Sequence, residues 1–265
     1  MTGRAVISSL RNHGYAVRAI VSTGKNRVAL ESLGAEVVVG DLGEKEIIET
    51  ALRDVTALYL MWPNFVEGEF ETLSRVITLA RNRVDRIIYH SVLRPHIEAM
   101  PHHWAKMRVE EKLYAQNVQY TILQPCAYLD NFFRQIPQIL QDRVASFPWG
   151  ENSAISYVDL RDVAEIATLV LTSVGHAGAS YELCGPDALV ADQVAKVMTQ
   201  FFGFAVRANV PMLPSRLESY SAKCMASMCD YYEQHGFAGG SKVLEGLLGR
   251  SPNNLEKWLE RFSQI

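Results

Sequence analysis

Cysteine is scarce in this sequence, and its spacing argues against a metal site or a redox pair. The 265 residues include four cysteines, Cys126, Cys184, Cys224 and Cys229, and the closest two lie five positions apart. A Cys-x-x-Cys redox motif needs a shorter spacing, and zinc sites need closely paired ligands. Scattered, infrequent cysteine is typical of a reducing compartment, so we expect a cytoplasmic protein without a bound metal.

Long hydrophobic runs and an excess of one charge are also missing. No apolar stretch approaches the roughly 18 residues of a membrane-spanning helix. The apolar run at residues 5–10 is too short for the core of a signal peptide and is followed by Arg11 and Asn12. The formal net charge of −3 at pH 7 gives no sign of the basic surface that attracts nucleic acid or anionic lipid. We therefore expect neither as a partner.

Hydrophobic residues are plentiful, and they occur in short runs between helical segments. They make up 48% of the chain, which suits one large domain or a domain with a smaller lobe. Runs such as EVVV at 36–39 and ALYLM at 57–61 are typical of parallel strands buried on both faces. The sequence predicts an α/β fold with a doubly wound parallel sheet over residues 1–185. Residues 186–265, helped by part of 126–152, are expected to form a smaller, mostly helical lobe over the ligand edge of the sheet.

Residues 101–133 carry the densest group of candidate site residues. They predict a helix, a short turn, a strand and a loop that opens a second helix. His102 and Lys106 are four positions apart, so they share one face of the helix, and Glu110 continues it. The strand stops at Gln124 and Pro125, because proline has no N–H for the next hydrogen bond. Ligands of open α/β sheets bind at the carboxyl ends of such strands.

The motifs in this region resemble the NmrA-like family, whose members are atypical short-chain dehydrogenase/reductases that bind NADP or NAD. They are His-x-x-x-Lys, V-E-E-x-L, Y-T-I-L-x-P and Y-x-D-N-F. The resemblance places His102 where the superfamily usually has a catalytic tyrosine, and Lys106 where it has a lysine. It implies that Lys106 holds ribose hydroxyls and that His102 transfers a proton near neutral pH. The alternative is a polar helix face with His103 as an accidental neighbour.

The start of the chain departs from the pattern of a dinucleotide-binding fold. Such folds open with a strand and a glycine-rich turn, whereas residues 1–6 already predict a helix. The resemblance matches Gly3 to the third glycine of the turn, so we expect a Rossmann-like sheet without its first strand. The strands at 17–21 and 57–60 would then leave a gap, close on each other or recruit another segment. A fold that never had this strand is the alternative. Arg4 is positioned to attract a phosphate.

Several residues near strand ends are expected to contact the cofactor. In the resembled family an aspartate at the position of Asp41 contacts adenine, although a turn aspartate that caps the next helix is equally consistent. Residues 22–27 contain no acid, while Lys25 and Arg27 favour NADP over NAD. Ser91 occupies the place of the catalytic serine or threonine of the superfamily, or is an ordinary strand-ending serine. The remaining expected cofactor contacts are Ser22, Trp62, Pro63, Pro125, Tyr128 and Asn131.

Two functions are consistent with the sequence and the resemblance. The first is a reductase that moves hydride from NADPH to a small carbonyl, quinone or dye-like acceptor. The second is a non-catalytic NADP(H) redox sensor that acts through a protein partner, and a homodimer is also possible. Asp159 and Asp162 begin a predicted helix, and we interpret both as structural because acidic side chains stabilise helix N-termini.

Overall fold

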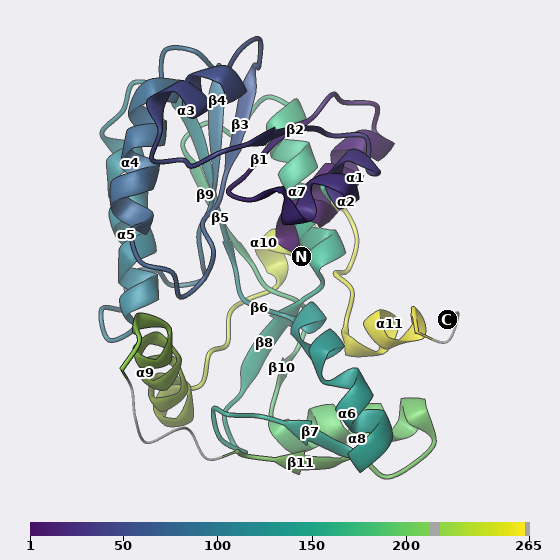
Figure 1. Ribbon diagram of the computed structural model, residues 1–265. Helices are drawn as coiled ribbons and strands as arrows, with labels where there is room; N and C mark the ends of the chain where they lie inside the picture. Colours follow the sequence, from purple (N-terminus) through teal and green to yellow (C-terminus); the bar gives the residue numbers. More distant parts are fainter. Residues whose placement is uncertain (212–217, 263–265) are drawn as a thin grey trace.

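Parallel strands with continuous apolar runs form the centre of the protein, whose computed structural model describes residues 1–211 and 218–262. The central sheet has the order β3-β4-β5-β9 and is parallel throughout. Its strands are β3 (Ala57–Leu60), β4 (Arg86–His90), β5 (Gln119–Pro125) and β9 (Ala179–Leu183). Helices α4 (Glu69–Ala80) and α5 (Pro101–Tyr114) cover one face, and α1 (Thr2–Asn12) and α7 (Leu160–Thr172) cover the other (Figure 1). This is the doubly wound arrangement that the sequence predicted.

Alternation along β4 shows how the two faces are separated. Successive strand residues point to opposite faces, and Ile87 and Tyr89 belong to the apolar cluster beneath α4 and α5. Ile88 belongs to the larger cluster that contains the buried side of α7. His90, two residues after Ile88, therefore points to the α7 face, whereas Ser91 falls on the α5 side. The candidate site residues are divided between the two faces in the same way.

A gap separates the central sheet from the first two strands. β1 (Arg18–Val21) and β2 (Glu36–Val39) form their own parallel sheet. Within the described residues β1 pairs with β2 alone, so the expected gap toward β3 is present. Val6 of α1 packs in the large core cluster, while the next residue, Ile7, packs in the small cluster with β1 and β2. Apolar packing of α1 thus joins the two sheets where hydrogen bonds between strands are missing.

Two small sheets and most of the later helices form the lower part of the view in Figure 1. One sheet has the order β10-β8-β6, and the other pairs β11 with β7. The strands are β6 (Ala127–Tyr128), β7 (Val144–Ser146), β8 (Ile155–Val158), β10 (Ala188–Leu189) and β11 (Arg207–Asn209). The remaining helices are α2 (Arg27–Glu31), α3 (Lys45–Ala51), α6 (Ile136–Asp142), α8 (Ala191–Phe202), α9 (Tyr220–His235), α10 (Lys242–Leu248) and α11 (Leu255–Glu260). Because strands from both sides of residue 185 share each small sheet, the division at that residue stays a prediction.

Two predicted element boundaries are present in the structure, and one segment differs. The strand β5 ends at Pro125 as predicted, and the carbonyl of this proline accepts a hydrogen bond from Leu93 N at 2.9 Å. The second helix expected after this strand is instead a 3-10 helix, Leu129–Arg134, followed by α6. Pro137 lies in the first turn of α6, where a missing N–H costs nothing. Helix α7 begins at Leu160, directly after Asp159, which caps it as predicted.

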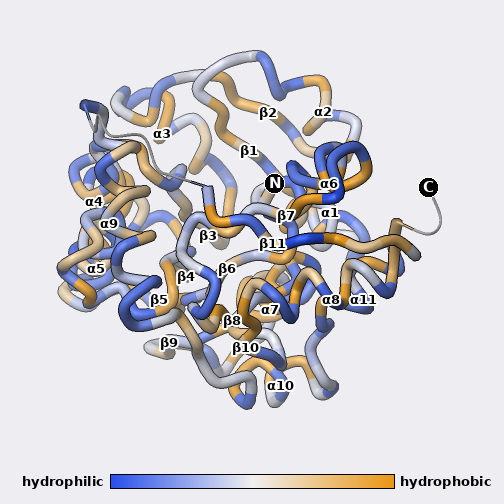
Figure 2. The backbone as a smooth tube through the Cα atoms, turned by 90° about the horizontal axis from the view of Figure 1, so that it is seen from below, coloured by the Kyte–Doolittle hydropathy of each residue, from blue (hydrophilic) through white to orange (hydrophobic). Residues whose placement is uncertain are grey.

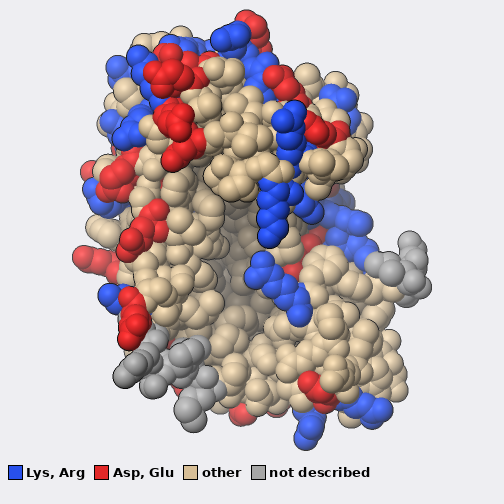
Figure 3. Space-filling model, viewed as in Figure 1, with Lys and Arg blue, Asp and Glu red and all other residues tan. Residues whose placement is uncertain are grey.

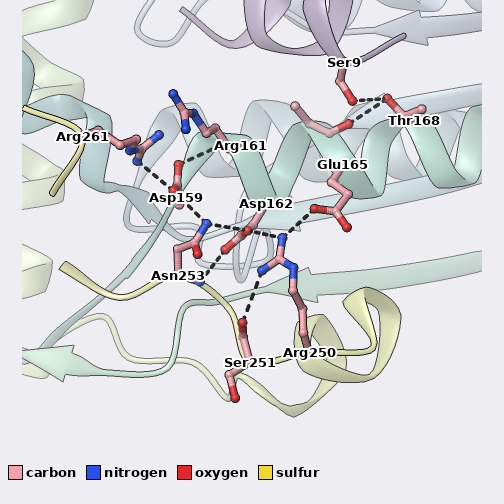
Figure 4. Close-up of polar contacts among 11 residues, drawn as sticks. Ser9, Asp159, Arg161, Asp162, Glu165, Thr168, Arg250, Ser251, Asn253 and Arg261 are labelled. Carbon is pink, nitrogen blue, oxygen red and sulfur yellow. Dashed lines mark hydrogen bonds and ion pairs between the residues drawn. The ribbon is translucent and has the colours of Figure 1, made fainter. Parts of the chain in front are cut away.

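Asp159 and Asp162 also fasten the C-terminal segment to the start of α7 (Figure 4). Asp159 accepts from Arg161 N at 2.9 Å and from Arg261 Nη2 at 2.7 Å. Asp162, which is fully buried, accepts from Arg250 Nη2 at 2.9 Å and from Asn253 N at 2.7 Å. The structural role expected of both acids is confirmed by these contacts.

The peripheral helices carry hydrophilic and hydrophobic residues side by side (Figure 2). This mixture is typical of helices that bury one side and expose the other. Over residues 1–211 and 218–262, none of the helices has the length and apolar character required to cross a bilayer.

Candidate active site

A deep hollow lies on the face of the molecule that Figure 3 shows, with lysine and arginine side chains along one side of it. In the matching ribbon view this is the region where the carboxyl ends of the central strands meet the start of α1 (Figure 1). Two further surface depressions lie elsewhere. One of about 330 Å³ is lined by Lys45, Ser74, Arg75, Thr78, Leu79 and Lys112, and one of about 520 Å³ includes Arg81, Asp85, Gln119 and Gly178. Neither contains a predicted site residue.

Lys106 lies at the centre of a buried polar group on the α5 face. Its Nζ donates to Glu69 Oε1 at 2.8 Å, and the Tyr89 hydroxyl donates to the same oxygen at 2.8 Å. Burial, and then the charge of Glu69, raises the pKa of Tyr89, so its phenol stays protonated. The Glu69 carboxylate at the start of α4 thus binds the Lys106 amine on α5. An ammonium has three N–H bonds, and Glu69 accepts one of them.

Ser91 belongs to a second polar group on the same side of the sheet. Its hydroxyl donates to Glu110 Oε1 at 2.5 Å, and Gln124 Nε2 donates to both oxygens of Glu110 at 2.9 and 3.0 Å. The Tyr114 hydroxyl contacts Glu110 Oε2 at 3.1 Å. Lys106 and Glu110 therefore share the buried face of α5, as their spacing predicted. Glu110, which holds the candidate hydroxyl, was predicted on this helix face, whereas Glu69, which holds the candidate amine, was not singled out by the sequence.

His102 lies one turn before Lys106 and is also buried, with 5% of its surface exposed. Its ring meets His103 edge-on with 4.5 Å between centroids, and Phe65 with 4.7 Å. Its Nδ1 has no hydrogen-bond partner within the described part of the chain. Burial, followed by the charges of His103 and Lys106, lowers the pKa of His102 to about 2. The ring is therefore neutral near pH 7.

A third polar group, on the α7 face, joins two tyrosines through a histidine. The Tyr59 hydroxyl lies 2.5 Å from His90 Nδ1, and the Tyr128 hydroxyl lies 2.5 Å from His90 Nε2. Burial, and then the charge of Lys106, lowers the pKa of His90 to about 3. The sequence analysis named Tyr128 as a cofactor contact and missed His90 and Tyr59. The signal was available in the alternation of the strands, because Tyr59 is paired with Ile88 and so shares a face with His90.

The residues expected at the phosphates lie around the first turn of α1. Gly3 is inside the helix, and a Cβ on it would lie 3.8 Å from Met61 Sδ. Arg4 is exposed and donates from Nη2 to Asn26 Oδ1 at 3.2 Å, which ties α1 to the turn after β1. No side chain caps the first turn, so its backbone N–H groups remain available to an anion.

The turn after β1 presents two cationic side chains, of which Lys25 has no ion-pair partner among the described residues and Arg27 has one. Lys25 is exposed on the 3-10 helix Gly24–Asn26, and Ser22 precedes it, also exposed. Arg27 is committed to Glu31, with Nε to Oε1 at 2.7 Å. Of the two predicted selectors of NADP, Lys25 is therefore the better placed.

The other predicted cofactor residues have ordinary local roles in addition to any ligand contact. Asp41 Oδ1 accepts from Gly43 N at 2.8 Å and closes a turn, while α3 begins later with Glu44 at its N-cap. The expectation that Asp41 caps α3 is therefore wrong. Trp62 Nε1 donates to Val66 O at 3.0 Å and fixes the bend after β3. Pro63 and Asn131 are exposed, whereas Pro125 is buried at the end of β5.

A model of the family described as NmrA-like matches residues 1–260. The chain belongs to the NmrA-like family. Quinone oxidoreductase 2 of Escherichia coli (strain K12) is 30% identical over 206 residues, which cover 76% of this chain and 71% of that protein. NAD(P)H azoreductase of Xenophilus azovorans is 25% identical over 210 residues, covering 77% of this chain and 72% of that protein.

Solved structures extend this NmrA-like similarity to the whole fold. An NADPH-dependent quinone oxidoreductase from Escherichia coli, crystallised with NADPH, is similar with a TM-score of 0.85 and 25% identity. The match covers 99% of this chain and 96% of that one. The Rossmann-like architecture and the helical C-terminal region are thus those of the family. The contacts of Lys106 and His90 given above are those of this chain.

Proposed function

We propose that the protein is a reductase that uses NADPH to reduce a small carbonyl, quinone or dye-like acceptor. The observation that carries this proposal is the meeting of three features at one edge of the sheet. They are the uncapped start of α1, the buried amine of Lys106 and the hydrogen-bonded group around His90. The quinone- and azo-reducing relatives support the same reaction class.

The residues around α1 fit the phosphates of NADPH. Burial, and then the charges of Arg4 and Arg134, lowers the pKa of the Met1 amino group, so both guanidinium groups lie within electrostatic reach of this helix end. Backbone N–H groups and cations together favour a pyrophosphate, and Lys25 would hold the additional phosphate on the adenosine ribose. When bound, NADPH supplies a hydride.

The chain's own residues would orient the cofactor and the acceptor. Two N–H bonds of Lys106 remain after its contact with Glu69, and they suit the two hydroxyls of a ribose. Ser91 and His102 are proposed to contact the reacting region, with Ser91 fixed by Glu110. Residues 186–265 are proposed to contribute to the acceptor site, and the reducing cytoplasm would suit the four free thiols.

The sensor alternative receives less support from the same observations. A sensor needs a cofactor site and, in addition, a surface that binds a partner protein. The relatives at 25% and 30% identity are named as catalysts. A protein partner therefore stays a secondary prediction.

Cofactor titration and an acceptor panel test the proposal together. Calorimetry should show tighter binding of NADPH than of NADH, and Lys25→Ala should narrow that difference. Arg27→Ala is the matched control, because this arginine already pairs with Glu31. NADPH oxidation would be followed by absorbance with a naphthoquinone, an azo dye and a triphenylmethane dye. Binding without turnover of any acceptor would support the sensor, and no binding of either nucleotide would contradict both functions.

A further inference from the structure

The ring of His90 lies between two tyrosine hydroxyls, and this geometry requires one hydroxyl to donate to the ring and the other to accept from it. The ring is buried, with 6% of its surface exposed, and each of its nitrogens lies 2.5 Å from a tyrosine oxygen. A neutral imidazole has one N–H donor and one acceptor nitrogen. One tyrosine must therefore donate to the ring while the other accepts from it. The accepting tyrosine keeps its own O–H for a third partner.

The surroundings of the two tyrosines identify Tyr128 as the one whose O–H points toward the hollow described above. Tyr128 also hydrogen-bonds the side chain of Thr2, in the first turn of α1. It is partly exposed, and it ends β6 just beyond the carboxyl end of β5. Tyr59 is on β3 within the sheet, and His90 Nδ1 is the hydrogen-bond partner that the structure gives its hydroxyl.

We propose that Tyr128 is the proton donor to the acceptor, and that His90 and Tyr59 are positioning residues that hold its oxygen and stabilise the phenolate left after transfer. This inference rests on the proposed reductase function and assigns the acid of that reaction. Tyr128 would supply the phenol that this chain lacks in its His-x-x-x-Lys motif. His102 is buried, and its Nδ1 has no hydrogen-bond partner within the described residues, so the structure gives it no contact with this group.

The proton balance of a quinone reduction fits this arrangement. The acceptor gains a hydride from NADPH and one proton, which together give the hydroquinone and NADP⁺. The Tyr128 O–H bond breaks as its proton passes to the acceptor oxygen. The His90 Nε2–H stabilises the phenolate that remains, while Tyr59 keeps the ring in this tautomer by donating to Nδ1. A proton from water then restores the Tyr128 hydroxyl, so each turnover takes up one proton.

Ionisation states near pH 7 suit each step. Burial, and then the charge of Tyr128, raises the pKa of Tyr59, and burial raises the pKa of Tyr128 against the opposing hydrogen bond from Thr2. Both phenols are therefore protonated before turnover. His90 is neutral and so has an acceptor nitrogen to offer. The Thr2 hydrogen bond and the His90 N–H both stabilise negative charge on the Tyr128 oxygen after transfer.

Three phenylalanine substitutions test the assignment with NADPH and a naphthoquinone. Tyr128→Phe should lower kcat by about 100-fold or more, the range for a lost general acid, with KM for both substrates changed by less than about threefold. Tyr59→Phe should lower kcat by about 10-fold and increase the solvent deuterium isotope effect. Tyr181→Phe is the matched control, because Tyr181 also pairs with a histidine, His176, at 2.9 Å in the same sheet. It should leave kcat unchanged.

Nitrogen-15 NMR of the His90 ring and calorimetry supply readouts that do not depend on turnover. The spectrum should show a neutral ring protonated at Nε2, and Tyr59→Phe should change the tautomer, whereas NADPH affinity should be the same in all variants. A ring protonated at Nδ1 would reverse the direction and overturn the proposal. Unchanged kcat in Tyr128→Phe would overturn the role of Tyr128 and leave the proposed reductase function standing. Failure of the unsubstituted protein to oxidise NADPH with any acceptor would overturn the proposed function and the role of Tyr128 with it.

Discussion

Lys106 Nζ and Glu69 Oε1 lie 2.8 Å apart, and the two side chains are only 2% and 5% exposed. The pair connects α5 to the first turn of α4 across the carboxyl edge of the sheet. Each charge is removed from water, so each depends on the other for compensation. Substitutions in this pair are therefore expected to change both the stability of the fold and the binding of the cofactor.

Removal of one partner should destabilise the fold strongly. Lys106→Met leaves the buried Glu69 carboxylate uncompensated, and we expect a loss of about 3–5 kcal/mol in the free energy of unfolding. The double variant Lys106→Met with Glu69→Gln should be more stable than the single one, because no buried charge remains. Urea denaturation measures both. Equal stability of the single and double variants would show that the carboxylate is not stranded.

Loss of the Lys106 amine should also weaken NADPH binding. In a Lys106→Ala, Glu69→Gln background, which avoids the stranded charge, we expect affinity to fall by about 1–3 kcal/mol through lost charge-assisted hydrogen bonds. The unsubstituted protein, in which the ion pair is intact, is the reference. Calorimetry measures both, and equal affinity of the two proteins would leave Lys106 with a structural role only.

Acid should destabilise the protein through its buried histidines. Burial lowers the pKa values of His102, His90 and His103 to about 2, 3 and 4, whereas an unfolded chain has histidines near 6.5. Below pH 6.5 the unfolded state therefore binds more protons, and stability falls with falling pH. Each histidine contributes up to about 1.4 kcal/mol per pH unit. At a pH well above the histidine pKa of the unfolded chain, this loss of stability is absent. Below it, each histidine continues to lower the stability until the pH reaches the pKa of that histidine in the folded protein.

Denaturation at pH 7.0, 6.0 and 5.5 measures this slope. Burial raises the pKa values of Asp130 and Asp162, so these two carboxyl groups act in the opposite direction to the histidines as the pH falls. His103→Gln should reduce the slope by about a third, since three buried histidines share it. His13→Gln, at an exposed position, is the control and should leave the slope intact. A slope independent of His103 would show that its ring is protonated in the folded state.

The attachment of the C-terminal segment should depend on Asp162 far more than on Glu165. Both carboxylates bind Arg250 Nη2, at 2.9 and 2.5 Å, but Asp162 is fully buried and Glu165 is half-exposed. Asp162→Ala strands the donors of Arg250 and Asn253, and we expect a loss of about 2–3 kcal/mol. Glu165→Ala removes an exposed ion pair that is worth less than about 1 kcal/mol. Thermal denaturation compares them, and similar losses would contradict the role of burial.

Local patterns predicted the strands and the shared face of α5 well. The runs at 36–39 and 57–61 became β2 (Glu36–Val39) and β3 (Ala57–Leu60). Strand periodicity and the four-residue spacing of His102 and Lys106 are properties of neighbouring residues, so the sequence contains them. A gap beside β3 was one of the three outcomes expected for a sheet without its first strand.

Pairings between distant residues could not be predicted in the same way. Glu69 reaches Lys106 across 37 positions, and Tyr59 reaches His90 across 31. Each pairing depends on strand register and on how the helices are placed against the sheet, and neither is set by local propensity. The side chains of the Tyr59–His90–Tyr128 group meet because the register of β3 and β4 places Tyr59 beside Ile88, and because Tyr128 ends the short strand that follows β5.

The gap beside β3 has a consequence for how cooperatively the protein unfolds. Hydrogen bonds across a sheet couple its strands into one unit, whereas β1 and β2 are joined to the rest through the side chains of a few helices. Segments with fewer shared contacts open at lower free energy than the global transition. In hydrogen exchange, the amides of residues 18–39 should therefore lose protection as one group, while those of β4 and β5 remain protected until the whole molecule unfolds. Residues 18–39 would then unfold separately from the central sheet, which would stay folded.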